Sequence, residues 1–525
     1  MQVYVTCWRC FPQWLAAVLI PCSILVATAA DLAKGGDPGK PNLLFVFSDQ
    51  QSRDALGCYD NPDVMTPQLD KLAAHGTLFE HGVSSCPVCT PMRGMLFSGQ
   101  HPLRNGAIHN DIPLLADNGE YFGHVLKFAG YHTGYIGKWH LLGGDRDRPV
   151  PPGPMRYGFD EVFLTDNCHV DYRPGQAYYW NEQGEKVFFK EWEVYGQARQ
   201  AMQFLDQCPS NQPFALFVSF HPPHDIGWQK EEPGVRNYDT EPELMRLYNP
   251  ARLKLRPSVK DSPGVRRAYQ GYYAMSSGVD KAFGWLMDKL VERGLQTNTL
   301  VVFTSDHGDN LMSYGYTLCK DVPENTAVRV PLLMRWPAKL LPSSVSQLPM
   351  GTLDLMPTIL GLMKLPIPST CEGRNLSQAI IKGDDNAVSS VPLFFVSPSN
   401  WRGVYTREYT YAVGEVEMLV RDDAGQWQMK VQPIQRLYDK KKDPFQLTNF
   451  YDDPNYAVIQ RKLDEETYAW MKRFKDPMAD GRQLKSQYGD GQGKFPLSTL
   501  APEFQGRPVD FANKIVSRED MPFSQ

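Results

Sequence analysis

The chain has little excess charge and, after its first 30 residues, no long hydrophobic run. Its 525 residues hold 54 Lys and Arg against 59 Asp and Glu, a formal net charge of −5. So small an excess argues against a polyanion-binding surface, and we expect no nucleic-acid partner. An anionic ligand would have to be recognised locally, by a few cationic residues. Because no later segment reaches about 18 uninterrupted apolar residues, we expect no membrane span there. Internal repeats and coiled-coil heptads are also absent.

The first 30 residues differ in composition from the rest of the chain. Arg9 lies in a short leading region, residues 14–26 are predominantly apolar, and Ala27-Thr28-Ala29 offers small residues for cleavage. This pattern is typical of a secretory signal peptide. We therefore expect residues 1–30 to be removed and the protein to be secreted or periplasmic, with no membrane attachment after cleavage.

Cysteine is scarce beyond this segment. Three of the ten cysteines fall within it, which leaves Cys58, Cys86, Cys89, Cys168, Cys208, Cys319 and Cys371. If Cys89 is modified, the other six can form up to three disulfides or remain buried free thiols. The spacing of Cys86 and Cys89 is also that of a redox pair or half a zinc site. No second such pair and no suitably spaced histidines follow, which argues against both.

Several apolar runs end abruptly in polar residues. The runs cover residues 43–47, 131–136, 214–220 and 300–303, and the polar residues that follow them include Asp49, Lys138, His140, His221, His224 and Asp306. Such short apolar runs suit strands buried on both faces of a mostly parallel sheet. Helical segments separate them. The clearest is 277–293, where Ser277 is the expected N-cap and Gly294 the expected end.

Alternating strands and helices predict an α/β fold with a large, mixed, mostly parallel sheet sandwiched by helices. Ligands of such sheets bind beyond the carboxyl ends of the strands, so the polar residues above should gather at one edge. We expect this catalytic domain to cover residues 31–390. Oxygen donors such as Asp49 and Asp306 at two strand ends suit a hard divalent cation, above all Ca²⁺.

Past residue 390 the pattern changes. Short strands are predicted at 391–396, 403–406, 409–413, 418–421 and 427–431, with a hairpin turn at 422–425 and a helix at 455–474. These elements predict a smaller α+β domain over residues 391–475 that carries an antiparallel sheet. Residues 476–525 are rich in Pro, Gly, Gln and Asp, and we expect an extended tail.

The segment Cys89-Thr90-Pro91-Met92-Arg93 is the most informative in the chain. Thr90 can cap a helix in which Pro91 takes the first position and residues 92–97 continue. Cys89 would then lie beside exposed backbone N–H groups, with Arg93 one turn on, in a pocket suited to an anion. The segment, with Leu96, Ser98 and Gly99, resembles C-x-P-x-R-x-x-L-x-T-G, the signature of formylglycine-dependent sulfatases in the alkaline phosphatase superfamily; Ser98 replaces the usual Thr and Met92 a usually small residue.

Further segments resemble other elements of that family, in the family's order. They are Asp49-Gln50, Gly137-Lys138-Trp139-His140, Pro223-His224, Ser305-Asp306-His307-Gly308, Lys320, Arg329-Val330-Pro331 and Leu437-Tyr438-Asp439. The resemblance implies that a maturation enzyme oxidises Cys89 to formylglycine, whose hydrate attacks sulfur. It also implies metal ligation of Ca²⁺, with Mg²⁺ as second choice, by Asp49, Gln50, Asp306, His307 and residue 89.

The resemblance assigns catalytic roles as well. Arg93, Lys138 and Lys320 would neutralise the sulfate, His224 would protonate the departing oxygen, and His140 would take a proton from the second hydroxyl of the hydrate. His221 competes with His224 for its role, although the proline before His224 favours the latter. The resemblance thus implies a sulfatase acting on a sulfated small molecule or glycan, and a carbohydrate is favoured by analogy.

Two alternatives remain open on sequence alone. A phosphonate monoester or phosphodiester hydrolase of the same superfamily would use a similar pocket, and a non-catalytic protein could use it to bind sulfated glycans. Aromatic residues within 168–192 either stack on sugar rings or pack this long insertion against the sheet. Trp401 and Arg402 are further candidates to line the cleft.

Overall fold

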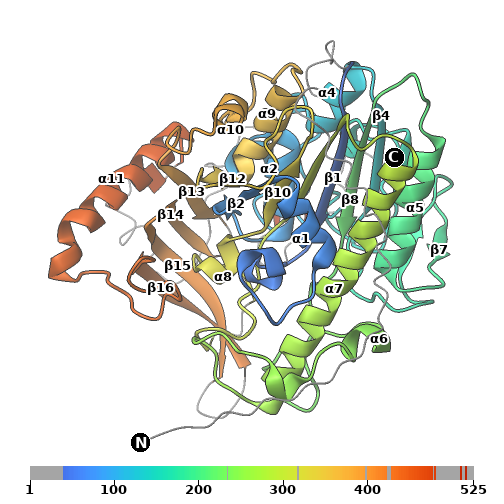
Figure 1. Ribbon diagram of the computed structural model, residues 1–525. Coiled ribbons are helices and arrows are strands. Elements are labelled where there is room, and N and C mark those ends of the chain that lie inside the picture. The colour runs from blue at the N-terminus through green and yellow to red at the C-terminus, as the bar shows by residue number, and fades with distance from the viewer. Residues whose placement is uncertain are drawn as a thin grey trace, which may run out of the picture. The chain divides into compact units, whose positions relative to one another are not determined.

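The predicted apolar runs form the middle of an eight-stranded sheet in a computed structural model of the chain (Figure 1). The order is β11 (Ser344–Ser346), β2 (Thr77–Phe79), β10 (Leu332–Arg335), β9 (Thr299–Ser305), β1 (Asn42–Ser48), β8 (Phe214–Phe220), β4 (His132–Gly137) and β5 (Val162–Leu164). Strands β9, β1, β8, β4 and β5 run parallel, whereas β10 is antiparallel to both of its neighbours. The predicted mixed, mostly parallel sheet is confirmed.

The structure describes residues 39–479, without 233, 316–318, 397–398, 422–426 and 477, and two further strands, β17 (Val509–Asp510) and β18 (Ile515–Val516). The predicted signal peptide, the hairpin turn at 422–425 and most of the predicted tail lie outside the described residues. Residues Lys40–Gln525 group as one unit by their contacts, and the domain boundary at residue 390 stays a prediction.

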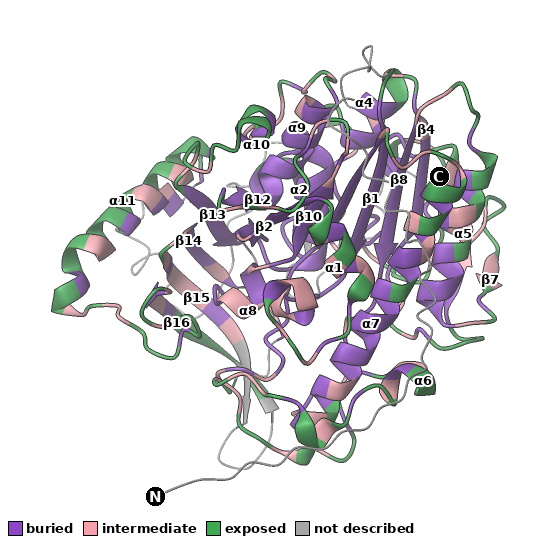
Figure 2. Cartoon of the chain, in the orientation of Figure 1, coloured by how far each residue is buried: buried purple, intermediate pink, exposed green. Residues whose placement is uncertain are grey.

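Helices cover both faces of the sheet, as alternate side chains of its strands require. Leu44 and Val46 of β1 pack in one apolar cluster with α1 (Pro67–Ala74), α5 (Glu193–Gln207) and α7 (Pro263–Glu292). Phe45 and Phe47 point the other way, into a cluster with α2 (Cys89–Ser98), α4 (Phe122–Phe128) and α9 (Thr352–Leu362). The strands between these layers are buried along their length (Figure 2).

Four other described α-helices have only four to six residues. They are α3 (Pro102–Asn105), α6 (Pro242–Met245), α8 (Asn325–Val328) and α10 (Ser377–Lys382). Two small sheets pair β3 (Gly82–Val83) with β12 (Met350–Gly351), and β6 (Tyr178–Trp180) with β7 (Lys186–Phe188). The described cysteines form no disulfide with one another. All of them are free thiols, five buried and two, Cys58 and Cys371, half-buried.

The predicted start of the long helix is wrong. Helix α7 begins at Pro263, where the side chain of Ser262 accepts a hydrogen bond from the Val265 N–H at 3.2 Å. Ser277 lies in the middle of the helix, and its hydroxyl donates to the Met65 carbonyl at 2.7 Å. Pro263 and Gly264 suggest a turn in the sequence, but proline is well tolerated in the first turn of a helix.

The antiparallel C-terminal sheet is confirmed, with different strand bounds. It comprises β13 (Ser390–Phe395), β14 (Asn400–Thr406), β15 (Tyr409–Arg421) and β16 (Trp427–Asp439), covered by α11 (Ala457–Arg473). The two strands predicted at 409–413 and 418–421 are a single strand, because β15 pairs with β16 over its whole length.

Trp401 and Arg402 do not line a cleft. Trp401 is fully buried in an apolar cluster that also contains Val88 and Met95, and its indole N–H donates to the Asp321 carbonyl at 3.0 Å. Arg402 is buried against Asp476, with its Nε donating to the carboxylate. Both residues join the C-terminal sheet to the segments that flank Cys89.

We expect Trp401→Ala to lower the free energy of unfolding by about 3–5 kcal/mol, because it removes a fully buried aromatic side chain and leaves a cavity. Guanidinium denaturation followed by circular dichroism measures this loss. The control is Phe128→Ala, where the side chain is 76 % exposed and the loss should stay within about 0.5 kcal/mol. Equal losses in the two variants would contradict the buried role of Trp401.

Candidate active site

The carboxyl ends of neighbouring parallel strands bring the predicted site residues together. Asp49 follows β1, Asp306 follows β9 and Lys138 follows β4, and all three side chains are fully buried. Gln50 and His140 adopt left-handed backbone conformations, with φ of 65° and 57°. This conformation is uncommon for residues other than glycine and concentrates at functional sites, where the chain turns sharply out of a strand.

Helix α2 presents Cys89 and Arg93 to this edge, but its start differs from the prediction. The helix begins at Cys89, and the backbone N–H of Thr90 donates to Asn110 Oδ1 at 3.0 Å. The Thr90 hydroxyl donates instead to the His140 carbonyl at 2.8 Å, so Thr90 is not the N-cap. Pro91 is the third helical residue, a position whose missing N–H costs no helical hydrogen bond.

Arg93 connects the two carboxylates at the centre of the site. Its Nη2 lies 3.1 Å from Asp49 Oδ2 and 3.1 Å from Asp306 Oδ2, and both ion pairs are fully buried. The Nη1 group donates to the Lys138 carbonyl at 2.9 Å and to Ser219 Oγ at 2.8 Å. The guanidinium therefore fixes the ends of four strands, β1, β9, β4 and β8, relative to one another.

The sulfur of Cys89 lies among cationic groups. Its distance is 3.3 Å to Lys320 Nζ, 3.6 Å to Lys138 Nζ and 3.4 Å to His307 Nε2. Burial and the Asp49 carboxylate oppose ionisation of the thiol, yet Lys138, Lys320 and His307 together lower the pKa of Cys89 well below its ordinary value. An anionic group is therefore stabilised at this position.

Lys320 and His224 form a hydrogen-bonded pair. The His224 Nδ1–H donates to the Asp225 carbonyl at 2.7 Å, which leaves the Nε2 lone pair to accept from Lys320 Nζ at 3.2 Å. Burial and the neighbouring charge of Lys320 lower the pKa of His224 to about 4. The imidazole is therefore neutral near pH 7, and the proton of the pair resides on the lysine.

His140 is oriented by a carboxylate that the sequence analysis missed. Its Nε2 lies 3.0 Å from Asp111 Oδ1, and Arg146 holds the same carboxylate with two hydrogen bonds of 2.7 Å. Its Nδ1 has no partner among the described residues. Although burial opposes the charge, Cys168 and Asp111 raise the pKa of His140 to about 10. Asp111 lies 29 residues before His140 and in no motif, so only the folded chain reveals it.

Gln50 is held by two further carboxylates that the motifs did not assign. Its Nε2 donates to Asp225 Oδ2 at 3.1 Å and to Asp309 Oδ2 at 2.9 Å, and its Oε1 accepts from Lys320 Nζ at 3.1 Å. The amide oxygen therefore faces the catalytic cluster. Asp225 directly follows His224 and Asp309 directly follows Gly308, so their positions next to these motifs could have indicated them from the sequence.

Four of the predicted metal ligands offer a plausible site for a cation. One ligand atom each of Asp49, Cys89, Asp306 and His307 lies within 4.8 Å of the others, and all four residues are buried. The His307 Nδ1–H donates to the Gly308 carbonyl at 2.9 Å, so its Nε2 lone pair is turned toward the cluster. Two carboxylates with one imidazole fit a divalent cation.

Other candidates from the sequence fall outside this cluster. His221 contacts Asp166 rather than Lys320 or Cys89. Of the aromatic residues within 168–192, several are buried as packing residues, namely Tyr172, Tyr178, Phe189 and Trp192, whereas Tyr179 and Trp180 are half-buried and Phe188 is exposed. The packing interpretation of this insertion therefore holds for the buried members.

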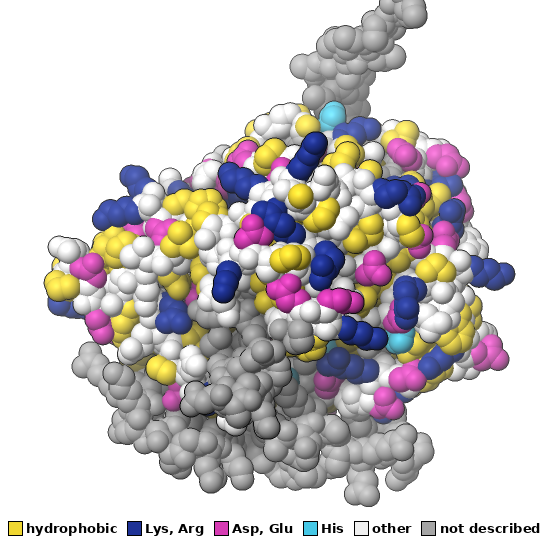
Figure 3. Space-filling model, turned by 90° about the horizontal axis from the view of Figure 1, so that it is seen from below, with side chains coloured by type: hydrophobic (Ala, Val, Ile, Leu, Met, Phe, Trp, Pro, Cys, Tyr) yellow, Lys and Arg dark blue, Asp and Glu magenta, His cyan; other side chains and the backbone are white. Residues whose placement is uncertain are grey.

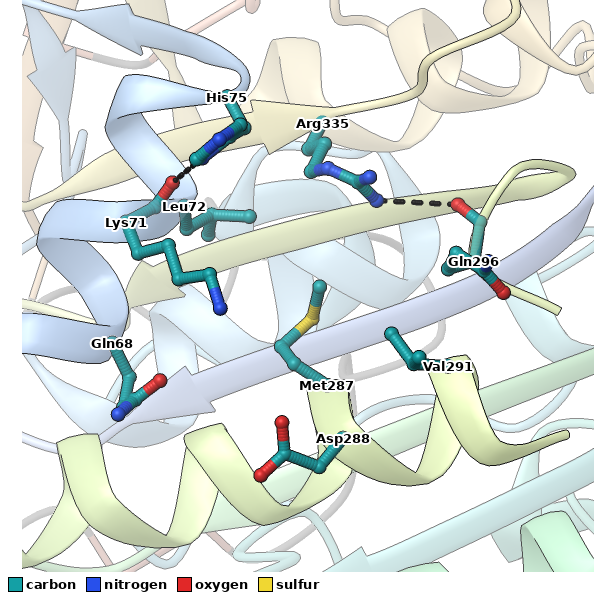
Figure 4. A pocket seen from close by; sticks show the side chains of 9 residues that line it. All are labelled: Gln68, Lys71, Leu72, His75, Met287, Asp288, Val291, Gln296 and Arg335. Atoms are coloured by element: carbon teal, nitrogen blue, oxygen red, sulfur yellow. Dashed lines mark hydrogen bonds between the residues drawn. The ribbon is translucent and has the colours of Figure 1, made fainter. Parts of the chain in front are cut away.

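A separate cavity of about 250 Å³ lies at the opposite edge of the sheet. Its lining includes Arg335, at the end of the antiparallel strand β10, and Gln296, just before β9 (Figure 4). It is therefore not part of the site. On the surface, Lys and Arg side chains intermingle with Asp and Glu on the face that Figure 3 shows, with no large patch of one sign.

Comparison with known proteins identifies the family. The sulfatase family model matches residues 41–365, a stretch that contains every site residue described above. This chain belongs to the sulfatase family. A second model, for the C-terminal part of N-sulphoglucosamine sulphohydrolase, matches residues 319–473. The sulfatase is thus a sulfuric ester hydrolase of the alkaline phosphatase superfamily, and that expectation from the sequence is confirmed.

Individual relatives cover most of the sulfatase chain. It is 31 % identical to an ulvan-active sulfatase of Formosa agariphila, over 88 % of this chain and 87 % of that protein. It is 28 % identical to an endo-4-O-sulfatase of Bacteroides thetaiotaomicron, over 83 % and 93 %. The crystal structure of a putative sulfatase from Bacteroides fragilis superposes with a TM-score of 0.72 at 28 % identity, over 85 % and 98 %. Within the described part of this sulfatase, no helix has both the length and the apolar character to cross a membrane.

We expect Arg93→Met to lower the free energy of unfolding by about 3–5 kcal/mol in EDTA, because it leaves two buried carboxylates without their shared partner. Added Ca²⁺ should restore part of this stability. Thermal and urea unfolding with and without Ca²⁺ measure both effects. As a control, Arg146→Met breaks an ion pair whose arginine is 43 % exposed and should cost less than about 1 kcal/mol. Unchanged stability of Arg93→Met in EDTA would contradict the central role of this arginine.

Proposed function

We propose that this sulfatase cleaves a sulfate ester of a glycan, with residue 89 as the nucleophile after oxidation of Cys89 to formylglycine. The observation that carries the proposal is the cationic surrounding of Cys89, whose sulfur lies within 3.6 Å of two lysine ammonium groups. A group that develops negative charge at residue 89 is stabilised there before substrate arrives. As its hydrate, formylglycine would supply a hydroxyl group as nucleophile at that position.

The charges around residue 89 suit an anionic substrate. The buried Arg93 and Lys138 and the half-buried Lys320 supply three cations against the two carboxylates Asp49 and Asp306. The positive excess attracts the negatively charged sulfate group and holds it for in-line attack. A divalent cation, Ca²⁺ or less favourably Mg²⁺, held by Asp49, Asp306, Gln50 and His307 would add to this charge neutralisation.

Lys320 and His224 are the groups we propose to protonate the departing oxygen. Lys320 Nζ donates to His224 Nε2 in the structure, so one proton is shared between these two atoms. Lys320 lowers the pKa of His224, and the negative charge of a bound sulfate ester nearby would raise it again. This favours transfer of the proton toward the ester. The neutral leaving alcohol then departs without forming a free alkoxide.

His140 is the group we propose to exchange a proton with residue 89 in the later half of the reaction. Asp111 occupies Nε2, so Nδ1 is the atom that remains for residue 89. Arg146 holds Asp111 on its other side, and together the two fix the ring. The raised pKa of His140 keeps its ring protonated near pH 7, so Nδ1 would have to give up its proton before it takes one from the second hydroxyl. That transfer would release sulfate and restore the aldehyde.

The names of relatives and the first residues of the chain support a substrate class and a location. Ulvan-active and endo-4-O-sulfatase are the names of relatives, and both point to sulfated polysaccharides for this chain. The predicted signal peptide supports export to the medium or periplasm, and the Cys89 motif supports a formylglycine-generating maturation enzyme as partner. A phosphonate monoester hydrolase of the same superfamily remains the rival, because phosphoryl and sulfuryl groups are similar in size and shape.

We expect Cys89→Ser to abolish multiple turnover, because a serine at this position cannot form the aldehyde hydrate that releases sulfate. The measurement is kcat/KM on an aryl sulfate and on an aryl phosphonate, with mass spectrometry of the Cys89 peptide from the native host. Wild type should carry formylglycine and prefer the sulfate. An unmodified thiol in active enzyme, or near-full activity of Cys89→Ser, would refute the nucleophile, and a preference for phosphonate would favour the rival.

We expect His224→Gln to lower kcat by about 10²–10⁴-fold on a sulfated sugar but much less on an aryl sulfate, since a phenol departs without a proton. The measurement is kcat for both substrates across pH. His75→Gln serves as the control, because this exposed histidine lines the cavity at the opposite edge of the sheet. Equal losses on the two substrates for His224→Gln would show that His224 does not protonate the leaving group.

A further inference from the structure

A second buried cluster of metal-ligating side chains lies beside the active site. Asp166 follows β5, Glu193 begins α5 and His221 follows β8. All three are fully or almost fully buried, and one ligand atom of each lies within 4.8 Å of the others. The cluster shares no residue with the four ligands proposed above. No step in the proposed reaction uses it.

Each of these side chains has one atom in use and one unpartnered atom among the described residues. Asp166 Oδ2 accepts from the His169 N–H at 2.6 Å, and Glu193 Oε1 accepts from Gln197 Nε2 at 2.6 Å. Asp166 Oδ1, Glu193 Oε2 and His221 Nδ1 are buried without a hydrogen-bond partner. Leaving buried polar atoms unpaired costs about 1–3 kcal/mol each, and more for charged groups. Three such atoms in one place indicate a ligand that all three contact.

A proton shared between the two carboxyl groups would not account for His221. Such a proton joins two oxygens only, and it would leave His221 Nδ1 buried without a partner, 4.0 Å from Asp166 Oδ2. Donor atoms that surround one cation, at about 2.0–2.2 Å from it, lie some 3–4 Å apart. One ligand atom of each of the three residues lies within 4.8 Å of the others, so a small movement of the side chains would bring all three into contact with one ion.

We propose that Asp166, Glu193 and His221 bind a divalent transition-metal ion, Mn²⁺ or Zn²⁺, at a site distinct from the catalytic cluster. Imidazole nitrogen favours such ions over Ca²⁺, and two carboxylate oxygens suit both of them. The amide oxygen of Gln197, also unpartnered, belongs to the side chain that holds Glu193 and is the next available donor. Two carboxylates and one neutral imidazole balance the charge of the ion.

The ion would fix the loops that carry catalytic residues. The Asp166 carbonyl accepts from the Trp139 N–H at 3.1 Å, between Lys138 and His140, and the Asn167 carbonyl accepts from the His140 N–H at 2.6 Å. His221 begins the turn that ends at His224, and their ring centroids are 5.5 Å apart. Binding one ion therefore ties the segment after β5 and the segment after β8 to the first turn of α5.

The test is binding of Mn²⁺ to the full chain, measured by electron paramagnetic resonance and by the shift in melting temperature, with Zn²⁺ measured by elemental analysis. We expect about one equivalent that survives Asp306→Asn, a change confined to the catalytic cluster. Glu193→Gln keeps the shape and the hydrogen bond to Gln197. It should weaken Mn²⁺ binding by at least about 100-fold, because even residues that only support ligands contribute about 10–100-fold.

Controls separate this site from the proposed catalytic cation. Glu191→Gln removes a half-buried carboxylate two residues away, which pairs with Arg199, and should leave Mn²⁺ binding unchanged. Asp166→Asn should reproduce Glu193→Gln, and circular dichroism reports whether each variant folds. Loss of Mn²⁺ binding in Asp306→Asn but not in Glu193→Gln would overturn the proposal. So would absence of Mn²⁺ and Zn²⁺ binding by folded wild-type protein, which would assign the unpartnered atoms to buried water.

Discussion

The buried ion pairs of Arg93 are the constraint on which the catalytic site depends. Two carboxylates, Asp49 and Asp306, lie at the ends of neighbouring strands with no exposure to water, and isolated buried charges of this kind are strongly unfavourable. Burial and the nearby Asp49 raise the pKa of Asp306 to about 6 even with Arg93 in contact, whereas the surrounding cations hold the pKa of Asp49 well below its usual value. Arg93 comes from helix α2, so the same ion pairs that neutralise the two carboxylates also hold this helix against the sheet edge. Because Cys89 lies one turn before Arg93 in the same helix, these contacts also fix residue 89, the proposed nucleophile.

The topology of the sheet supplies this arrangement directly. Strands β1, β8, β9 and β4 are in register and parallel, so their polar successors emerge at one edge without long loops. Apolar clusters on both faces hold the strands, and a side chain that leaves a strand end finds a dry environment. In such an environment the hydrogen bonds of Lys320, His224 and Asp111 are stronger than in water, and they cannot be exchanged for solvent at low cost.

The sequence allowed the sheet and most of the charged cluster to be predicted, because both depend on local patterns. The run 214–220 coincides with β8, and Asp49, Cys89, Arg93, Lys138, His307 and Lys320 lie together as their motifs predict. Features that depend on distant contacts were missed. Thr90 is a good N-cap by residue type, but Asn110 from another loop takes that role. Trp401 is a candidate to line the cleft on sequence alone, yet it is buried, because the C-terminal sheet packs beside α2.

The two buried clusters differ in a way that bears on their roles. Around Asp49 and Asp306 every carboxylate oxygen has a partner, several of them cationic side chains, so the charge is already balanced by the protein. A cation that joins this cluster must share those oxygens with Arg93 and Lys138, and the net positive charge that results serves an anionic substrate. Around Asp166 and Glu193 one oxygen of each carboxylate has no partner, and no arginine reaches them. A cation bound there would complete the folded protein rather than prepare it for substrate, because it would occupy donor atoms that no described side chain uses. The same edge of the sheet thus combines two kinds of site. Around residue 89 the cationic side chains outnumber the carboxylates Asp49 and Asp306, which suits catalysis on an anion. Around Asp166 and Glu193 carboxylate oxygens lack partners, which suits an ion that holds loops in place.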